Sequence, residues 1–212
     1  MRLIRSKLWL LNVTVLINQT EQQVGISRLK AEGLILNKTV VFVGMMGAGK
    51  SLVGHALAKY LNVEFFDSDA EIESAENTTI QKIFEYDGEV LFRHKERQII
   101  KRLMNRQKPI VLATGGGTFL TSKNRYYISK NGFSIFLNVP VEVLWPRVMN
   151  DYSRPLLKEN NAFSTLQSLY SERLPFYLGA DLEFAIAKNI LPNIIIENIV
   201  NILIERNIVI YP

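Results

Sequence analysis

The sequence of 212 residues contains no cysteine. This absence excludes disulfides and thiolate metal sites, and it is compatible with a reducing compartment. No arginine-rich run and no alternation of aromatic with basic residues marks a nucleic-acid surface, so we expect no nucleic-acid partner. The formal charge of +5 does not require a nucleic-acid partner, because small anionic substrates need positive charge too.

Long hydrophobic segments are also scarce at the start of the chain, where the apolar stretch at residues 8–17 is too short to cross a bilayer. It follows three basic residues, a pattern that resembles a weak signal peptide or a membrane-surface helix. No small-residue cleavage site follows it, and the next residues are polar. We therefore interpret residues 1–37 as a flexible extension, with membrane contact by residues 1–17 as the alternative.

Residues 44–51, with the sequence GMMGAGKS, fit the phosphate-loop pattern G-x-x-x-x-G-K-[ST] at every fixed position. A β-branched and aromatic run at 39–43 predicts a buried strand before the loop, and apolar residues at helical spacing over 53–61 predict a helix after it. In such a loop, backbone N–H groups and the helix N-terminus surround phosphate oxygens, while Lys50 reaches the β- and γ-phosphates. The expected nucleotide-binding residues of the loop are Gly47, Ala48, Gly49, Lys50, Ser51 and Leu52.

The rest of the chain alternates predicted strands with predicted helices, the further strands lying at residues 63–66, 109–113, 133–137 and 181–186. Helices are predicted at 70–107, with breaks near 77–79 and 87–88, and at 122–130, 141–150, 163–177 and 194–206. Pro146 lies inside one of these helices, where a proline costs about 3 kcal/mol unless it occupies the first turn. The alternation predicts an α/β fold with a parallel five-stranded sheet and helices on both faces. We expect one domain over residues 38–212, with a mobile polar segment at 151–162.

Several polar motifs fall at the ends of the predicted strands, where an open α/β sheet binds its ligands. They are GMMGAGKS at 44–51, FFDSD at 65–69, FRHKE at 92–96, TGGGT at 114–118, SRPLL at 153–157 and SERLPFY at 171–177. Their order and spacing over residues 38–184 resemble those of the shikimate kinase family. The phosphate loop alone is shared by very many nucleotide-binding proteins, whereas the ordered combination is highly specific. The resemblance implies the P-loop kinase architecture within the predicted α/β class.

The shikimate kinase family phosphorylates the 3-hydroxyl of shikimate with ATP and Mg²⁺, in the pathway to chorismate and the aromatic amino acids. By matched position, the resemblance implies that Asp69 orients the reacting hydroxyl and acts as its base. It also implies that Arg93 and Arg173 bind the shikimate carboxylate and that Gly116 offers its backbone N–H. Independently of the resemblance, an arginine fork suits a planar carboxylate, and glycines let the backbone approach a small substrate closely.

The same resemblance implies which residues contact ATP and the metal ion. Lys50 and Ser51 keep their phosphate and Mg²⁺ roles, and Asp67 lies near the metal. Arg154 belongs to the mobile polar segment, which acts as a lid, and it approaches the ATP phosphates when the lid closes. Arg147 lies against adenine. A closed lid excludes water, which would otherwise accept the phosphoryl group. The residues assigned to catalysis are Asp69, Lys50 and Arg154.

Structural interpretations of the same residues stay open at this point. Asp69 has the position of an N-cap for the helix that follows it. Arg93 and Arg97 can form a solvated helix face with Glu89 and Glu96. For Arg97 the structural interpretation is the one that we adopt, whereas for Arg93 the family motif favours a function.

Three other functions compete with shikimate phosphorylation. The nearest is another small-molecule kinase of similar build, such as a gluconate kinase; Arg93, the glycine triplet and Arg173 favour a cyclic carboxylate that carries hydroxyls. A non-catalytic nucleotide-binding module is the second, and the presence of the catalytic set argues against it. A membrane-attached protein is the third. We expect a cytoplasmic monomer with shikimate and ATP as its partners.

Overall fold

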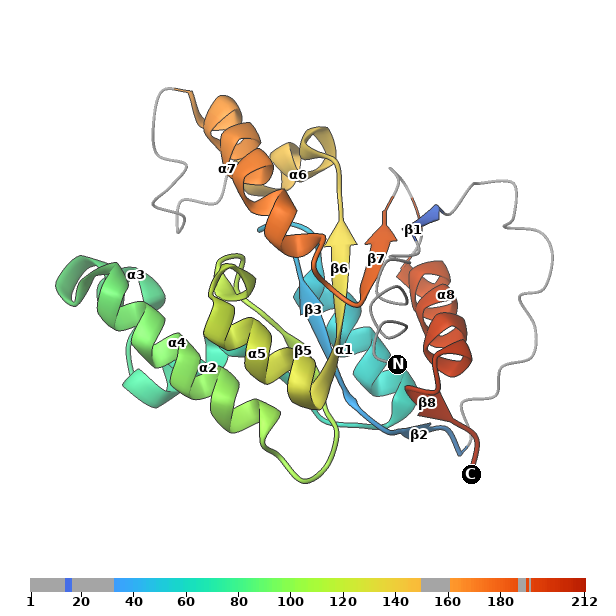
Figure 1. Cartoon of the computed structure of the whole chain (residues 1–212). Helices are drawn as coiled ribbons and strands as arrows, with labels where there is room; N and C mark the ends of the chain where they lie inside the picture. Colours follow the sequence, from blue (N-terminus) through green and yellow to red (C-terminus); the bar gives the residue numbers. More distant parts are fainter. Residues whose placement is uncertain (1–13, 17–32, 150–160, 187–189, 191) are drawn as a thin grey trace, which may run out of the picture.

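A parallel sheet of six strands forms the centre of the computed structural model, which describes residues 14–16, 33–149, 161–186, 190 and 192–212. The strand order is β1-β7-β6-β3-β5-β4, and each neighbouring pair runs parallel. The strands are β1 (Thr14–Leu16), β3 (Thr39–Val43), β4 (Phe65–Asp67), β5 (Val111–Ala113), β6 (Gly132–Asn138) and β7 (Leu182–Ala185). The five strands β3 to β7 confirm the predicted sheet, and β1 extends its edge beside β7 (Figure 1).

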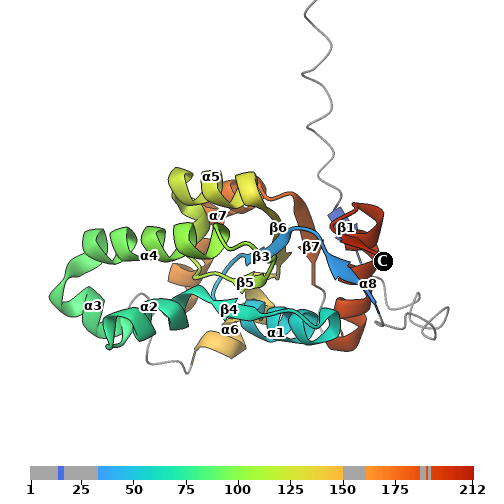
Figure 2. The ribbon, with the colours of Figure 1, turned by 90° about the horizontal axis from the view of Figure 1, so that it is seen from below.

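The helices follow the strands along the chain and cover both faces of the sheet. They are α1 (Lys50–Leu61), α2 (Ser68–Glu76), α3 (Ile80–Tyr86), α4 (Gly88–Met104), α5 (Ser122–Asn131), α6 (Val141–Val148), α7 (Ala162–Tyr177) and α8 (Pro192–Glu205), with a 3-10 helix at Thr118–Leu120. Figure 2 shows α1 and α5 on opposite faces. The helical region 70–107 divides near both predicted breaks. Pro146 lies inside α6 with an exposed side chain, and the helix continues through it to Val148.

The second predicted strand begins later than the sequence pattern indicates. Residues 63–66 were expected to be extended, but β4 starts at Phe65. Asn62 ends α1 in a left-handed conformation with φ of 54°, and the Val63 N–H then bonds to the carbonyl oxygen of Ala58. Val63 therefore completes the end of the helix instead of joining the sheet.

A second, two-stranded sheet pairs β2 (Ile35–Leu36) antiparallel with β8 (Val209–Ile210), and neither strand was predicted. Leu36 and Val209 are buried in the common core. The packed domain thus includes β2, ahead of the predicted boundary at residue 38. Much of the predicted extension, at residues 1–13 and 17–32, lies outside the described residues, as does most of the predicted lid.

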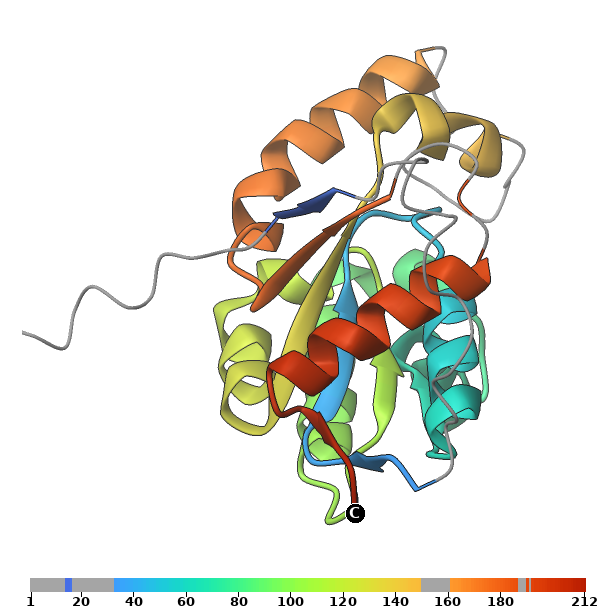
Figure 3. The same cartoon turned by 90° about the vertical axis from the view of Figure 1, so that its right-hand side faces the viewer.

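The carboxyl ends of the parallel strands form the end of the sheet where the predicted motifs gather. All five residues of β3 are buried, and the strand leads directly into the phosphate loop. Figures 1 and 3 show α6 and α7 over this same end of the sheet. Within the described ranges, no helix combines the length and apolar character that crossing a membrane requires.

Candidate active site

The phosphate loop joins β3 to α1 and turns at two glycines with left-handed backbone. Gly47 has a φ of 76° and Gly49 a φ of 88°, values that residues with side chains rarely adopt. Lys50 is buried. Its ammonium group folds back over the loop and donates to the carbonyl oxygens of Gly44 (2.9 Å) and Met45 (2.8 Å). The loop therefore brings a cation to the place where its backbone can surround an anion.

Helix α6 packs directly on the outer side of the phosphate loop. The Arg147 guanidinium donates a hydrogen bond of 3.0 Å to the carbonyl oxygen of Gly47. A Cβ atom at Gly47 would lie 2.6 Å from Cγ1 of Val148, so only glycine permits this approach. Two other residues predicted to contact the nucleotide differ in exposure: Ala48 is buried, whereas Leu52 is exposed. Arg147 thus lies beside the phosphate loop.

Ser51 and Asp67, the two residues predicted at the metal, are in direct contact. The Ser51 hydroxyl donates to Oδ2 of Asp67, and Oδ1 of Asp67 accepts from the Asp69 backbone N–H at 3.0 Å. Asp67 is therefore the N-cap of α2, and the interpretation of Asp69 as that cap is wrong. In the described part of the chain, no three His, Asp or Glu side chains gather into a metal site. Mg²⁺ in kinases needs only one or two protein carboxylates besides substrate phosphates, so this pair fits it.

Asp69 lies in the first turn of α2 as a partly buried residue whose carboxylate oxygen Oδ1 is buried. Its Oδ1 atom has no hydrogen-bond partner among the described residues. Burial is the main cause that raises the pKa of Asp69 to about 6, with a further increase from Asp67, while Lys50 opposes the shift. A carboxylate with this pKa is mainly ionised at neutral pH and is a better proton acceptor than an exposed aspartate.

Each glycine of the triplet faces one of the predicted substrate-binding side chains. A Cβ atom at Gly115 would lie 2.5 Å from Oδ1 of Asp69, and one at Gly116 would lie 3.5 Å from Nη1 of Arg173. One at Gly117 would lie 2.5 Å from both Nη atoms of Arg93. The absence of side chains at 115–117 lets these three charged groups, from three different helices, converge on one short stretch of backbone.

Arg93 is held by a buried carboxylate that the sequence interpretation treated as part of a solvated face. Glu96 is 1% exposed and accepts from Nη1 of Arg93 at 3.1 Å, from the Thr118 hydroxyl at 2.8 Å and from the Asn124 amide at 3.4 Å. Glu89 binds the other side of the guanidinium at 3.2 Å. The predicted pairing with Glu89 and Glu96 is thus confirmed for Arg93, which it orients toward the glycine triplet, but is wrong for Arg97, which forms no ion pair among the described residues. Thr118 ends the TGGGT motif but was not predicted as a site residue, and Asn124 carried no signal in the sequence.

Tyr177, the last residue of α7, was not predicted as a site residue although it ends the SERLPFY motif. Its side chain is fully buried, and its ring stacks on Phe136 with centroids 5.1 Å apart. The hydroxyl donates to the Gly116 carbonyl oxygen at 2.5 Å and lies 3.7 Å from Sδ of Met45. Burial raises the pKa of Tyr177 to about 12, while Arg173 opposes the shift, so the phenol stays protonated as a donor.

The described site contains the predicted residues apart from Arg154, which lies outside the described residues with 151–160. A parallel sheet whose central strand leads into a lysine-bearing phosphate loop, with a partly buried carboxylate nearby, defines a P-loop small-molecule kinase. The chain belongs to the shikimate kinase family, because the profile described as shikimate kinase matches residues 46–205.

Comparisons with individual proteins agree with this assignment. A shikimate kinase from Ruegeria pomeroyi is 54% identical over 147 residues, which cover 69% of this chain and 75% of that protein. One from Rhizobium meliloti is 42% identical over 153 residues, covering 72% and 79%. The structure of a shikimate kinase from Acinetobacter baumannii in complex with shikimate has a TM-score of 0.74 and 37% identity, covering 80% of this chain and 94% of that one. The predicted family and enzyme class are confirmed, and a kinase of this family implies ATP and a divalent metal ion.

Proposed function

We propose that this chain transfers the γ-phosphoryl group of ATP to the 3-hydroxyl of shikimate, forming shikimate 3-phosphate and ADP on the pathway to chorismate and the aromatic amino acids. The convergence of Asp69, Arg173 and Arg93 on residues 115–117 is the observation that carries this proposal. It supports a pocket that offers one proton acceptor and two guanidinium groups to a single small molecule. A ring that bears both a carboxylate and hydroxyls matches these three groups.

We assign the nucleotide side of the reaction to the phosphate loop and its neighbours. Lys50 would exchange the carbonyl oxygens of Gly44 and Met45 for phosphate oxygens, and the backbone of the loop residues would donate its N–H groups. We assign Mg²⁺ to Ser51 and Asp67, and the direct hydrogen bond between them supports this assignment. The bound ion would neutralise charge on the phosphate oxygens. The contact of Arg147 with the loop supports its assignment beside adenine.

We assign the chemical step to Asp69, with the arginines holding the acceptor. Arg93 and Arg173 would bind the shikimate carboxylate, and the Gly116 N–H would bind a polar group of the ring. The 3-hydroxyl oxygen would form a bond to the γ-phosphorus while the bond to the β-phosphate oxygen breaks. The hydroxyl proton would pass to Asp69, whose buried, partnerless Oδ1 supports a role as its acceptor. Because such transfers have loose transition states, orientation by Asp69 would matter as much as its basicity.

Three further assignments rest on the family resemblance and general chemistry. We propose that Arg154, in the lid at 151–162, stabilises the ATP phosphates on closure. We also propose that the enzyme acts as a monomer, because the substrate-side groups described above all come from one chain. The dependence on ATP supports a cytoplasmic location.

A coupled ADP-release assay tests the proposed reaction. Purified protein with MgATP is offered shikimate, gluconate or nucleoside monophosphates in parallel. We expect turnover with shikimate, and a shikimate 3-phosphate product by mass spectrometry and ³¹P NMR. Turnover of gluconate in preference to shikimate would replace the proposed acceptor by a sugar acid. ADP release that is independent of every acceptor would leave only an ATPase.

A further inference from the structure

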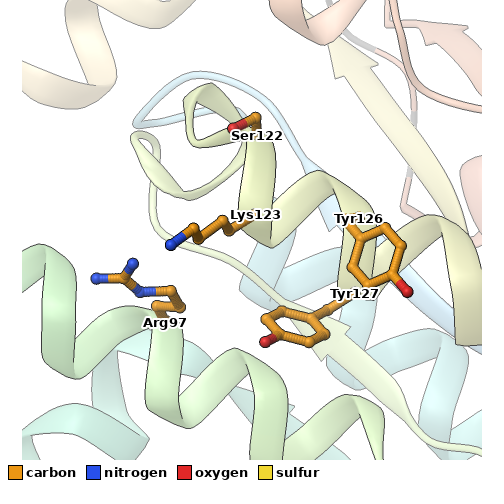
Figure 4. A pocket seen from close by; sticks show the side chains of 5 residues that line it. All are labelled: Arg97, Ser122, Lys123, Tyr126 and Tyr127. Atoms are coloured by element: carbon orange, nitrogen blue, oxygen red, sulfur yellow. The ribbon is translucent and has the colours of Figure 1, made fainter.

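A hollow of about 430 Å³ lies between α4 and α5 (Figure 4). Arg97 contributes to it from α4, and α5 contributes the rest of the lining: Ser122, Lys123, Tyr126 and Tyr127. Arg97 is one helical turn beyond Arg93 on α4, and none of the proposed substrate or nucleotide residues lines the hollow. The hollow is open to solvent, since Ser122, Lys123 and Tyr126 are exposed.

The hollow brings two positive charges together without a compensating acid. Figure 4 shows the charged ends of Arg97 and Lys123 pointing to the same side, while the ring of Tyr127 lies on the other side of the Arg97 stem. Among the described residues, neither cation forms an ion pair, and no Asp or Glu lines the hollow. The Arg97 guanidinium forms a long hydrogen bond of 3.5 Å with Nδ1 of His94. Two neighbouring cations repel each other, and an anion between them would remove that repulsion.

The neighbouring acid, Glu96, is committed elsewhere. Its carboxylate accepts hydrogen bonds within the buried cluster formed with Arg93, Thr118 and Asn124. Helix α5 has no acidic residue along its whole length. Arg97 therefore differs from Arg93 on the same helix, because no acidic side chain described in the structure neutralises it.

We propose that this hollow is a binding site for a small phosphate-bearing anion. Arg97 and Lys123 supply the charged hydrogen-bond donors, a guanidinium fork and an ammonium, while the Tyr126 hydroxyl points away from both. A phosphate group offers several acceptor oxygens and up to two negative charges, so it matches this set better than a carboxylate does. The site is independent of the proposed reaction, since it shares no residue with it.

Residue-resolved NMR tests the proposal, because phosphate also binds the phosphate loop. Backbone amide shifts of the ¹⁵N-labelled protein are followed during titration with inorganic phosphate, glycerol 3-phosphate or benzoate, at ionic strength held constant with chloride. We expect saturable shifts at residues 122–127 with both phosphates and weaker ones with benzoate, separate from shifts at 44–51. The two phosphate arms distinguish free phosphate from a phosphorylated metabolite.

Two matched double variants separate a site from general attraction. Arg97→Gln with Lys123→Gln should weaken phosphate binding at 122–127 by about tenfold or more, as loss of charge-assisted hydrogen bonds predicts, while shifts at 44–51 persist. Lys101→Gln with Lys130→Gln removes the same charge from exposed positions on the same two helices and should leave both sets of shifts. The proposal is overturned if wild-type residues 122–127 do not respond, or if both double variants weaken their response equally.

Discussion

The hydroxyl of Tyr177 donates a 2.5 Å hydrogen bond to the carbonyl oxygen of Gly116 and thereby joins the end of α7 to the glycine triplet. The same helix carries Arg173 one turn earlier. The hydroxyl also contacts Met45, whose carbonyl oxygen accepts from Lys50. Tyr177 therefore connects the loop proposed to bind the nucleotide with the backbone proposed to bind the acceptor.

We predict that Tyr177→Phe raises the KM for shikimate more than it lowers kcat. The variant leaves a partly buried carbonyl oxygen without its donor, which costs at most about 1–3 kcal/mol, and it frees the Gly116 peptide to reorient. Steady-state kinetics against each substrate would show the split. Tyr170→Phe is the matched control, since it removes a 2.7 Å hydrogen bond to Asn138 from the same helix without touching the triplet. Equal effects of the two variants would reduce Tyr177 to a general packing residue.

Lys50→Met should fold normally and lose most phosphoryl transfer. The change removes the cation nearest the loop backbone, and the loss of one such electrostatic contact typically lowers kcat by about 10²–10³-fold. Circular dichroism and the ADP-release assay measure the two parts of this prediction. Lys59→Met, on the exposed face of the same helix, should keep its activity. A folded Lys50→Met enzyme with near-normal turnover would contradict the role assigned to Lys50.

Arg93→Lys should raise the KM for shikimate by about ten- to a hundredfold, the range expected for loss of a charge-assisted hydrogen bond. Lysine keeps the positive charge, but it cannot form a bidentate fork with the shikimate carboxylate or with the carboxylate of Glu96. The KM for ATP should change little. Arg102→Lys, lower on α4 and paired with Glu71 at the surface, serves as the control. A defect in ATP affinity instead would move Arg93 to the nucleotide site.

Asp69→Asn should lower kcat by at least about 10²-fold, the low end of general-base contributions. In the wild-type enzyme, kcat/KM should fall on the acid side as Asp69 becomes protonated, with an apparent pKa of about 6. The Asn variant should lack this limb in its residual activity. A wild-type profile that stays flat down to pH 5 would argue that Asp69 orients the hydroxyl without accepting its proton.

The same substitution should stabilise the protein at high pH. The folded-state pKa of Asp69 lies above its ordinary value of 3.8, so the neutral form is favoured by folding, and stability is lost as the pH rises from 3.8 through 6. At pH 8 the Asn variant should gain at most about 3 kcal/mol in free energy of unfolding, and at pH 4 almost nothing. Urea unfolding at both pH values measures this. Glu85→Gln, exposed on α3, should show no such difference.

The sequence predicted the fold best where the signal is local. The buried run before the phosphate loop, the glycine triplet and the breaks in the region 70–107 each depend on neighbouring residues, and each appears in the structure. The two-residue strands β2 and β8 were not predicted, because each is shorter than any periodic pattern and pairs with a partner more than 170 residues away.

Within the site, sequence motifs identified side chains better than the contacts between them. Asp69 and Asp67 were both recognised, but which of them caps α2 depends on the direction in which each side chain turns. The burial of Glu96 likewise depends on Thr118 and Asn124, which approach from outside α4. Such tertiary contacts leave no periodic pattern in the sequence from which they could be predicted.

The pairing of β2 with β8 has a practical consequence for how the enzyme can be handled. Beyond β8, Tyr211 and Pro212 are exposed, and Figure 1 shows this terminus at the opposite end of the sheet from α6 and α7. An affinity tag fused after Pro212 would attach the protein to a sensor surface with its ligand-binding end facing the solution. Deleting residues 207–212 instead would strip Leu36 of its strand partner, so this terminus tolerates addition far better than removal.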